Sequence, residues 1–344
     1  MSSLVDAAAA ARPRSRFVRR PPALAPGLLA AVAVAAAATP LGRLVPVVGA
    51  PVFALALGAA AAAFLGERAS LRPGVAFASR TVLQGAIVVL GASLSLTRVA
   101  SVGAGSLPVM LGSLAAALGV AALAGRLLRI GPTLRTLVGV GTGVCGASAI
   151  AAVSGVVGAA DAEVAYAVST IFAFNVVAVV LFPLLGHALG LSAHAYGLWA
   201  GTAVNDTSSV VAAAYAYGHA AGAYAVIVKL TRTTTIVPIV LVLAAARLRR
   251  TGERSERSLR RVVPWFLLWF VLAAAANTSG LVSPALAHDA SRAGVALITV
   301  ALAGVGLSTR FAAVRAAGVR PLLLGALVWA AVAVSSLALI WATG

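Results

Sequence analysis

The side chains best placed to do chemistry are one acid and two bases that lie within long apolar segments. Asp206 follows Asn205 inside one such segment, and an ionisable residue at membrane depth is a candidate for a functional site. Lys229 and Arg232 lie in the next apolar segment, three residues apart and therefore on one helical face. Buried cations need a counter-charge, and Asp206 is the only acid at that depth. One carboxylate beside two cations leaves an excess of about one positive charge, which favours an anion as ligand.

Two stretches rich in glycine, serine and threonine interrupt the apolar segments around these charges. Residues 141–148 read GTGVCGAS and residues 201–208 read GTAVNDTS, so the octets repeat each other at an offset of 60. Such stretches tend to unwind at mid-membrane, where protein or a cavity must satisfy the freed backbone groups. Positive helix ends and hydroxyl groups would then line a pocket for a small anion with several oxygens. The order of the spans makes the two segments parallel, so a crossed inverted pair would require either that one of them is re-entrant or that the span count is wrong there.

These residues make up one predicted binding site. Its substrate-binding residues are Lys229, Arg232, Thr142, Cys145, Gly146, Ser148, Asn205, Thr207 and Ser208, and its ion-coupling residue is Asp206. Three alternatives stay open: the bases could be a snorkelling pair near a span end, the acid could belong to a structural ion pair, and the glycines could serve close helix packing. Asn175, a single amide within a span, is interpreted as an interhelical hydrogen-bonding residue. No catalytic or metal-ligating residue is predicted, since no His lies near the single Cys in the sequence.

The composition indicates which kind of protein holds these groups. Of 344 residues, 61% are hydrophobic and only 10% are charged, and the mean hydropathy is +1.04. These values exclude a soluble globular enzyme and a disordered chain. The single Cys excludes a disulfide scaffold and a Cys-based zinc site. We therefore predict an all-α polytopic membrane protein, with a transmembrane transporter domain at 24–344 after a disordered, basic cytoplasmic tail at 1–23.

Eleven apolar segments are long enough to cross the hydrocarbon core as helices. They are 24–42, 45–65, 75–97, 104–124, 136–158, 164–188, 196–217, 222–246, 262–283, 292–309 and 321–343. With a cytoplasmic N-terminus, 20 of the 26 Lys and Arg residues fall on the inner side, three on the outer side and three within spans. This asymmetry follows the positive-inside rule and explains the net charge of +18 without nucleic-acid binding. A miscount of two spans would leave the orientation unchanged, whereas a miscount of one in the middle would not.

A longer internal repeat indicates the architecture of the chain. Residues 91–112 match residues 304–325 at nine of 22 positions, and the matches include Gly, Pro and Ser pairs. By our count seven spans separate the two copies, so the copies run in opposite directions. Inverted-topology repeats with broken helices are typical of secondary transporters, whose binding sites lie near the middle of the membrane.

Three motifs make the chain similar to a known family. GTGVCGASAI at 141–150, NDTSSVVAA at 205–213, and Lys229-Leu-Thr-Arg232 resemble the YeiH-like family of bacterial inner-membrane proteins, which are labelled putative sulfate exporters. The resemblance covers about residues 26–343 in matching order. That family is distantly similar to the sodium/proton antiporter and bile-acid symporter superfamily. The resemblance implies a core bundle with two broken, crossing helices and a panel domain that moves against it.

We expect a secondary transporter that exports or exchanges a small, sulfate-like anion by alternating access across the bacterial inner membrane. No Walker-type phosphate loop is present, which argues against a primary pump. A cation/proton antiporter is the alternative, because Asn205-Asp206 is similar to the acid pair of that superfamily, and an intramembrane enzyme is a weaker one. We expect no cofactor and H+ or Na+ as the coupling ion. The expected partners are the anion and the lipid bilayer, not nucleic acid, and a homodimer is the oligomer to test.

Overall fold

The computed structural model describes residues 24–44, 49–65, 68–251, 265–308 and 319–343, and every regular element in them is a helix. Seven of the described helices are long and apolar enough to cross a membrane, and three shorter ones are apolar. The described residues of each of the eleven predicted apolar segments are mainly helical, which confirms the all-α polytopic membrane class. The predicted tail at 1–23 lies outside the described residues.

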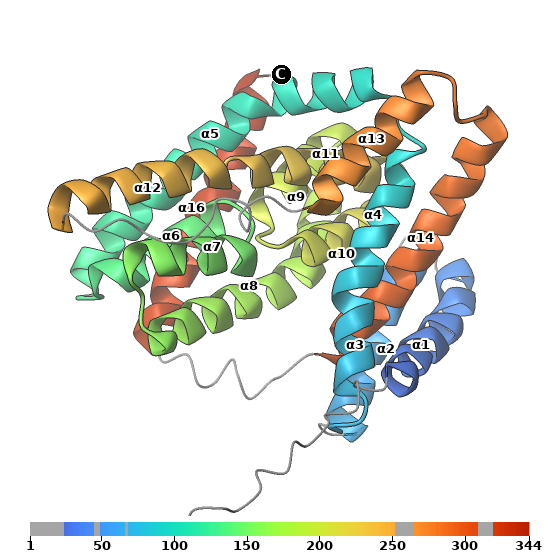
Figure 1. Ribbon diagram of the computed structural model, residues 1–344, viewed down its shortest axis with the longest axis horizontal. Coiled ribbons are helices and arrows are strands. Elements are labelled where there is room, and N and C mark those ends of the chain that lie inside the picture. Colours follow the sequence, from blue (N-terminus) through green and yellow to red (C-terminus); the bar gives the residue numbers. More distant parts are fainter. Residues whose placement is uncertain (1–23, 45–48, 66–67, 252–264, 309–318, 344) are drawn as a thin grey trace, which may run out of the picture.

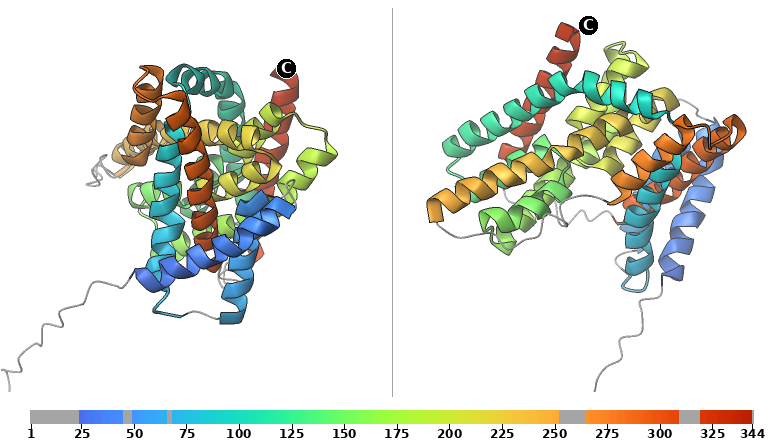
Figure 2. Two further views of the ribbon diagram at one scale, coloured as in Figure 1. Left: turned by 90° about the vertical axis from the view of Figure 1, so that its right-hand side faces the viewer. Right: turned by 45° about the horizontal axis from the view of Figure 1, so that its top comes forward.

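The helices form two groups, which lie on the right and on the left of Figure 1. Figure 2 shows from two further sides that the N-terminal helices, in blue, lie beside α14, in orange. The first group, which we call the panel, comprises α1 (Ala25–Leu44), α2 (Gly49–Leu65), α3 (Arg72–Phe77), η2 (Ala78–Val82), α4 (Leu83–Gly91), α13 (Trp265–Thr278) and α14 (Pro284–Leu307). The second, the core group, comprises α5 (Leu96–Leu127), α6 (Pro132–Gly143), α7 (Ala147–Val157), α8 (Asp161–Ala188), α9 (Ala193–Ala203), α10 (Thr207–Tyr217), α11 (His219–Thr234), α12 (Ile236–Thr251) and α16 (Val319–Thr343).

Glycine lets the panel helices approach each other backbone to backbone. A Cβ on Gly58 of α2 would lie 2.6 Å from the carbonyl oxygen of Ala303 in α14, and Gly306 of α14 lies against the α2 backbone in return. Helices α1 and α3 meet in the same way at Gly27 and Gly74. Lipid is as apolar as the side chains, so helices in a membrane associate through close van der Waals packing, which small residues permit.

Helix α14 runs antiparallel to the helix formed by α3, η2 and α4. A Cβ on Gly294 would lie 2.6 Å from Leu90 Cδ2, and a Cβ on Gly304 would lie 2.8 Å from Ala78 Cβ. The chain therefore moves backward along α4 and η2 as it advances along α14, which is the relative direction that an inverted repeat requires. The second repeat copy continues into 309–318, which lies outside the described residues.

The apolar segment 196–217 turns back on itself. Tyr196, near the start of α9, stacks on Tyr217 at the end of α10 with ring centroids 3.8 Å apart. The Tyr196 hydroxyl also donates to the carbonyl oxygen of Ala213 at 3.2 Å. Helices α9 and α10 therefore run antiparallel and form a helical hairpin, with its turn at 204–206.

The apolar segment 136–158 turns back as well. Thr136, near the start of α6, lines a groove together with Leu243 of α12. Arg247, one turn further along α12, donates from Nη1 to the carbonyl oxygen of Val156 near the end of α7 at 2.9 Å. Both outer ends of the α6–α7 pair thus lie at the same end of α12, so this pair is a second helical hairpin.

The two hairpins approach from opposite ends of the α11–α12 helix, which is continuous over His219–Arg249. The base of the α9–α10 hairpin lies at the start of α11, where Gly197 packs against Ala221, and the base of the α6–α7 hairpin lies near Arg247. In the described part of the chain, the eleven apolar segments are therefore two re-entrant hairpins and nine segments that continue in one direction. Two predicted crossings, 136–158 and 196–217, become hairpins that return to the side they came from. Only the loops between these two segments change sides, and they contain no Lys or Arg, so the predicted side of the Lys and Arg residues is unaffected.

Candidate functional site

The tips of the two hairpins meet inside the core group. Gly146, which precedes α7, lies against Asp206, which precedes α10, and a Cβ built on Gly146 would be 3.2 Å from Asp206 Cβ. Gly146 has a φ of +69°, a conformation that residues with a side chain rarely adopt, so both the backbone and the space favour glycine. The two residues occupy the same position in the repeated octets. The crossed pair is thus formed by two segments that are both re-entrant.

Lys229 joins the two tips from α11. Its ammonium donates to the carbonyl oxygen of Val144 at 3.0 Å and to that of Val204 at 2.8 Å, and its side chain is fully buried. Val144 follows the last residue of α6 and Val204 follows the last residue of α9, so both acceptors lie at negative helix ends. An ammonium group with three donors suits a place where carbonyl oxygens converge. Two helix ends therefore supply the counter-charge of Lys229.

Asp206 is held by four hydrogen-bond donors at the start of α10. Its Oδ1 accepts from the Ser209 N–H at 2.9 Å and from Ser208 Oγ at 2.5 Å. Its Oδ2 accepts from Ser209 Oγ at 2.8 Å and from Asn175 Nδ2 of α8. Asp206 is therefore the N-cap of α10, where a carboxylate stabilises the positive end of the helix.

Asp206 contributes to the counter-charge of Lys229 only at a distance. Asp206 and Lys229 lie near enough to interact electrostatically, but no ion pair joins them in the part of the chain that the structure describes. The reason is the polarity of the helix break at 204–206. The base binds the negative end of the helix that stops there, and the acid binds the positive end of the helix that starts there.

Arg232 is buried without the partners that Lys229 has. Its side chain is 1% exposed, yet Nε, Nη1 and Nη2 have no hydrogen-bond partner among the described residues. It lies near enough to Cys145, in the turn of the first hairpin, for the two side chains to interact electrostatically. Buried polar groups in native proteins are nearly always satisfied, and an unpaired buried charge costs several kcal/mol. The guanidinium therefore indicates a place for an anionic ligand.

The other predicted site residues lie at the same two tips. Cys145 is buried in the turn between α6 and α7. Asn205 is buried, and neither atom of its side-chain amide has a hydrogen-bond partner within the described ranges. Thr142 is buried in the last turn of α6. The hydroxyl residues that are exposed or partly exposed in the first turns of α7 and α10 are Ser148, Thr207 and Ser208.

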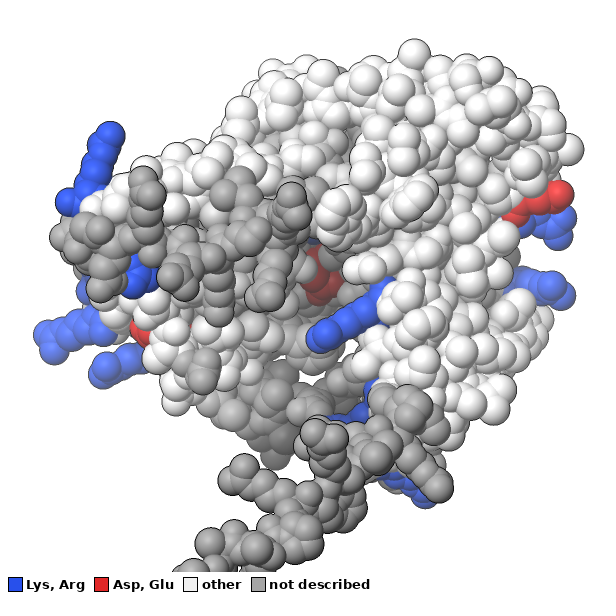
Figure 3. Space-filling view, in the orientation of Figure 1, with Lys and Arg blue, Asp and Glu red and all other residues white. Residues whose placement is uncertain are grey.

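At the hairpin tips, the positive helix ends, at the starts of α7 and α10, are more accessible than the negative ends of α6 and α9. Asp206 is partly exposed. In Figure 3 most of the visible face is uncharged, and the Lys and Arg side chains lie mainly toward its edges. Helix α7 begins after Gly146 without a side-chain cap, so its first N–H groups remain available as donors. An anion at the start of α7 would meet these N–H groups together with the hydroxyl of Ser148.

Asn175 belongs to the site, although the sequence did not predict this. Its Nδ2 donates to Asp206, and its Oδ1 accepts from the Asn205 N–H at 3.2 Å, so α8 is fastened to the tip of the second hairpin. Its predicted role in interhelical hydrogen bonding is confirmed. A single amide inside an apolar segment was the available signal, but its partner lies 31 residues further along the chain.

Comparisons with known proteins find one family, and the matches cover most of the chain. A family model described as Conserved hypothetical protein 698 matches residues 26–325. The UPF0324 membrane protein spyM18_1033 of Streptococcus pyogenes serotype M18 is 44% identical over 324 residues, which cover 91% of this chain and 96% of that protein. SAG1125 of Streptococcus agalactiae serotype V is 38% identical over 320 residues, with 91% and 95% covered, and a UPF0324 membrane protein of Clostridium tetani is 38% identical over 315 residues, with 87% and 91% covered. These matches confirm the YeiH-like resemblance.

Proposed function

The chain belongs to the family described as conserved hypothetical protein 698, and from that premise and the geometry of the hairpin tips we propose that it is a secondary transporter of a small, sulfate-like anion. The anion is exported or exchanged by alternating access. The protein lies in the bacterial plasma membrane with its N-terminus in the cytoplasm, an orientation supported by the 20 basic residues that fall on one side.

The observation that carries this proposal is the unpaired guanidinium of Arg232. Lys229 is engaged with two carbonyl oxygens and Asp206 with four donors, so Arg232 holds the charge excess of the site. A guanidinium presents its donors in a planar fork that matches the oxygens of a carboxylate, phosphate or similar oxyanion. An anion with several oxygens would satisfy these donors and neutralise the buried charge together.

The helix ends at the tips support an anion rather than a metal cation. In transporters with broken helices, negative helix ends and unwound carbonyls coordinate Na+. Here the carbonyl oxygens of Val144 and Val204 already bind the ammonium of Lys229. The uncapped positive end of α7 remains open, and positive ends attract anions. A cation/proton antiporter is therefore the less supported alternative.

Asp206 is the residue that we assign to coupling with H+ or Na+. Its carboxylate is partly exposed and lies beside Gly146 at the contact between the two tips. A protonated carboxyl group donates one hydrogen and keeps less capacity to accept, so its four present donors could not all be retained. A change in the charge of Asp206 would thus alter the start of α10, and movement of the panel against the core group would expose the tips to one side at a time.

Counterflow in reconstituted vesicles tests the proposal. Vesicles that contain the full chain and are loaded with unlabelled sulfate should accumulate labelled sulfate, whereas vesicles without protein should not. Arg232→Lys keeps the charge but removes the planar fork, and it should lower the initial rate by about tenfold, equivalent to about 1.4 kcal/mol. Arg249→Lys is the matched control, because Arg249 is an exposed arginine of α12 away from the tips, and it should leave the rate unchanged.

The same vesicles distinguish the alternatives. Both variants are first compared with the parent chain by thermal unfolding, so that a loss of fold is not taken for a loss of transport. Sulfite, thiosulfate and phosphate are tested as competitors of the label to define the class of anion. Proton movement driven by a Na+ gradient, without counterflow of any of these anions, would identify a cation/proton antiporter and contradict the proposal. We continue to expect that the chain is not an enzyme, since no His lies near Cys145 in the sequence to act as its general base.

A further inference from the structure

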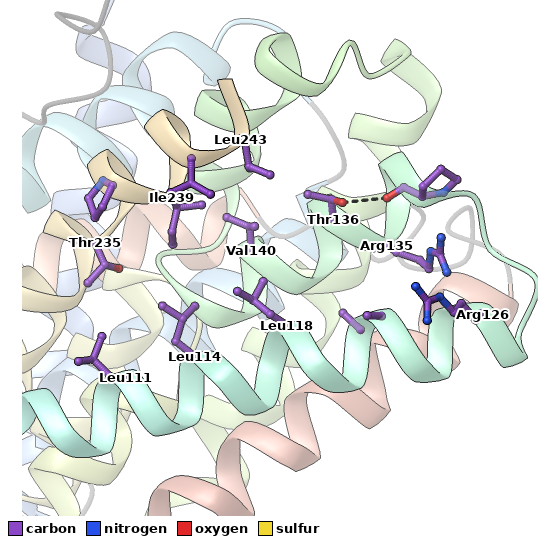
Figure 4. A pocket seen from close by; sticks show the side chains of 15 residues that line it. Leu111, Leu114, Leu118, Arg126, Arg135, Thr136, Val140, Thr235, Ile239 and Leu243 are labelled. Atoms are coloured by element: carbon purple, nitrogen blue, oxygen red, sulfur yellow. Dashed lines mark hydrogen bonds between the residues drawn. The ribbon is translucent and has the colours of Figure 1, made fainter. Parts of the chain in front are cut away.

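A cavity lies between α5, α6 and α12, on the outer side of the first hairpin (Figure 4). Its volume of about 520 Å³ lies within the range of pockets that hold small organic ligands. Most of the side chains around it are apolar. Along its length the groove is lined by Leu111, Leu114, Leu118, Val140, Ile239 and Leu243.

Two arginines stand at one end of this groove. Figure 4 shows Arg126 of α5 and Arg135 of α6 next to each other, at the opposite end from Leu111 and Thr235. The methylene stem of Arg135 lies against Gly125, which keeps this side chain beside α5. No hydrogen bond or ion pair to a described residue engages either guanidinium. The groove therefore combines a long apolar wall with two cations at one end that have no acidic partner among the described residues.

We propose that this groove binds an anionic phospholipid, with an acyl chain along its apolar wall and the phosphate between Arg126 and Arg135. Leu111 and Val242, which line the groove, are also exposed at the molecular surface, as expected where a membrane protein meets lipid tails. The arginines lie at the end of α5 and the start of α6, on the side that the basic residues mark as cytoplasmic. Basic pockets between membrane helices on that side bind anionic headgroups.

The chemistry of the groove distinguishes this ligand from the transported anion. A small hydrated anion gains nothing from a wall of leucine and isoleucine side chains, and a zwitterionic lipid brings no net charge to the arginines. A lipid in the groove would contact three helices and hold α6 between α5 and α12. It would bind the folded chain and not the unfolded one, so it should stabilise the protein by mass action. This proposal stands independently of what the hairpin tips transport.

Lipid titration of the delipidated full chain in detergent tests the proposal. Dioleoyl phosphatidylglycerol in mixed micelles should raise the unfolding temperature by about 2 °C or more above the shift given by dioleoyl phosphatidylcholine. Native mass spectrometry should show one retained phosphatidylglycerol. The double variant Arg126→Gln/Arg135→Gln should abolish the difference between the two lipids. Arg249→Gln removes an exposed cation from the end of α12 outside the groove, and it should preserve the difference.

A second variant separates the apolar wall from the charge. Ala122 is an exposed residue that lines the groove, so Ala122→Phe should fold normally, fill the groove and reduce phosphatidylglycerol binding with both arginines present. The proposal is overturned if both lipids stabilise the parent chain equally, if the double variant keeps the difference, or if glycerol 3-phosphate alone reproduces the shift. A lipid-free dimer that Ala122→Phe dissociates would also overturn it, because a second copy of the chain would then cover the groove.

Discussion

The carbonyl oxygens of Val144 and Val204, 60 positions apart in the chain, accept hydrogen bonds from one ammonium group. Lys229 supplies that group from the middle of the α11–α12 helix, and the two bonds measure 3.0 and 2.8 Å. The two hydrogen bonds of Lys229 therefore hold the tips of both hairpins to each other and to the α11–α12 helix. The two buried bases therefore differ: Lys229 holds the tips together, whereas the guanidinium of Arg232 has no hydrogen-bond partner among the described residues.

Lys229→Met should destabilise the protein by about 2 kcal/mol, because two buried carbonyl oxygens lose their donor. The loss is smaller than two full desolvation penalties, since the variant also removes a buried charge. Chemical unfolding in detergent measures the change. Thr234→Val is the matched control on the same helix, because the Thr234 hydroxyl is exposed and bonds within its own helix, at Thr231. Equal stability of both variants would show that the ammonium does not fasten the tips.

Gly146→Ala should destabilise the protein by about 1–2 kcal/mol, since the φ of +69° strains any residue with a Cβ. The added Cβ would also press on Asp206 at 3.2 Å, so transport should fall with stability. Gly119 of α5 has no atom within 4 Å of a built Cβ, and Gly119→Ala should therefore stabilise the chain by about 0.5–1 kcal/mol. Opposite shifts in unfolding temperature are the expected result, and shifts of the same sign would contradict it.

Asp206→Asn and Asp206→Ala should separate stability from ion coupling. Asparagine is a good N-cap and can keep the bonds that Oδ1 makes to Ser208 and Ser209, whereas alanine loses them all and should cost about 1 kcal/mol more. Neither variant carries a titratable group, so both should lose the dependence of anion transport on a pH or Na+ gradient. Transport that still follows the gradient in both variants would exclude Asp206 as the coupling residue.

Asn175→Leu should destabilise the protein by about 1–2 kcal/mol, because Asp206 and the Asn205 N–H each lose a partner from α8. Asn277→Leu is the comparison, since Asn277 is a partly exposed amide of the panel, away from the hairpin tips, and this change should have little effect. The two variants are compared by thermal unfolding at matched detergent concentration. A larger effect at position 277 would contradict the assigned role of Asn175.

The apolar pattern predicted the helical segments, whereas the orientation indicated by the distribution of Lys and Arg stays a prediction. The octets at 141–148 and 201–208 also predicted where two helices break and which polar residues gather there. The pattern did not predict that both segments turn back. An apolar stretch of about 22 residues has the same length and hydropathy whether its two halves continue or reverse, so hydropathy carries no information about direction at the break.

The sequence by itself determined which residues are polar inside the membrane, because each of them is an exception within an apolar run. Only the tertiary structure decided how they pair. Lys229 binds two helix ends and Asp206 binds Asn175, since hydrogen bonding depends on which distant segments lie side by side. A helix end also acts as a charge only near its last carbonyl groups, and only the tertiary structure brings the ends of α6 and α9 to the ammonium of Lys229. The same arrangement leaves Arg232 without a hydrogen-bond partner in the part of the chain that the structure describes.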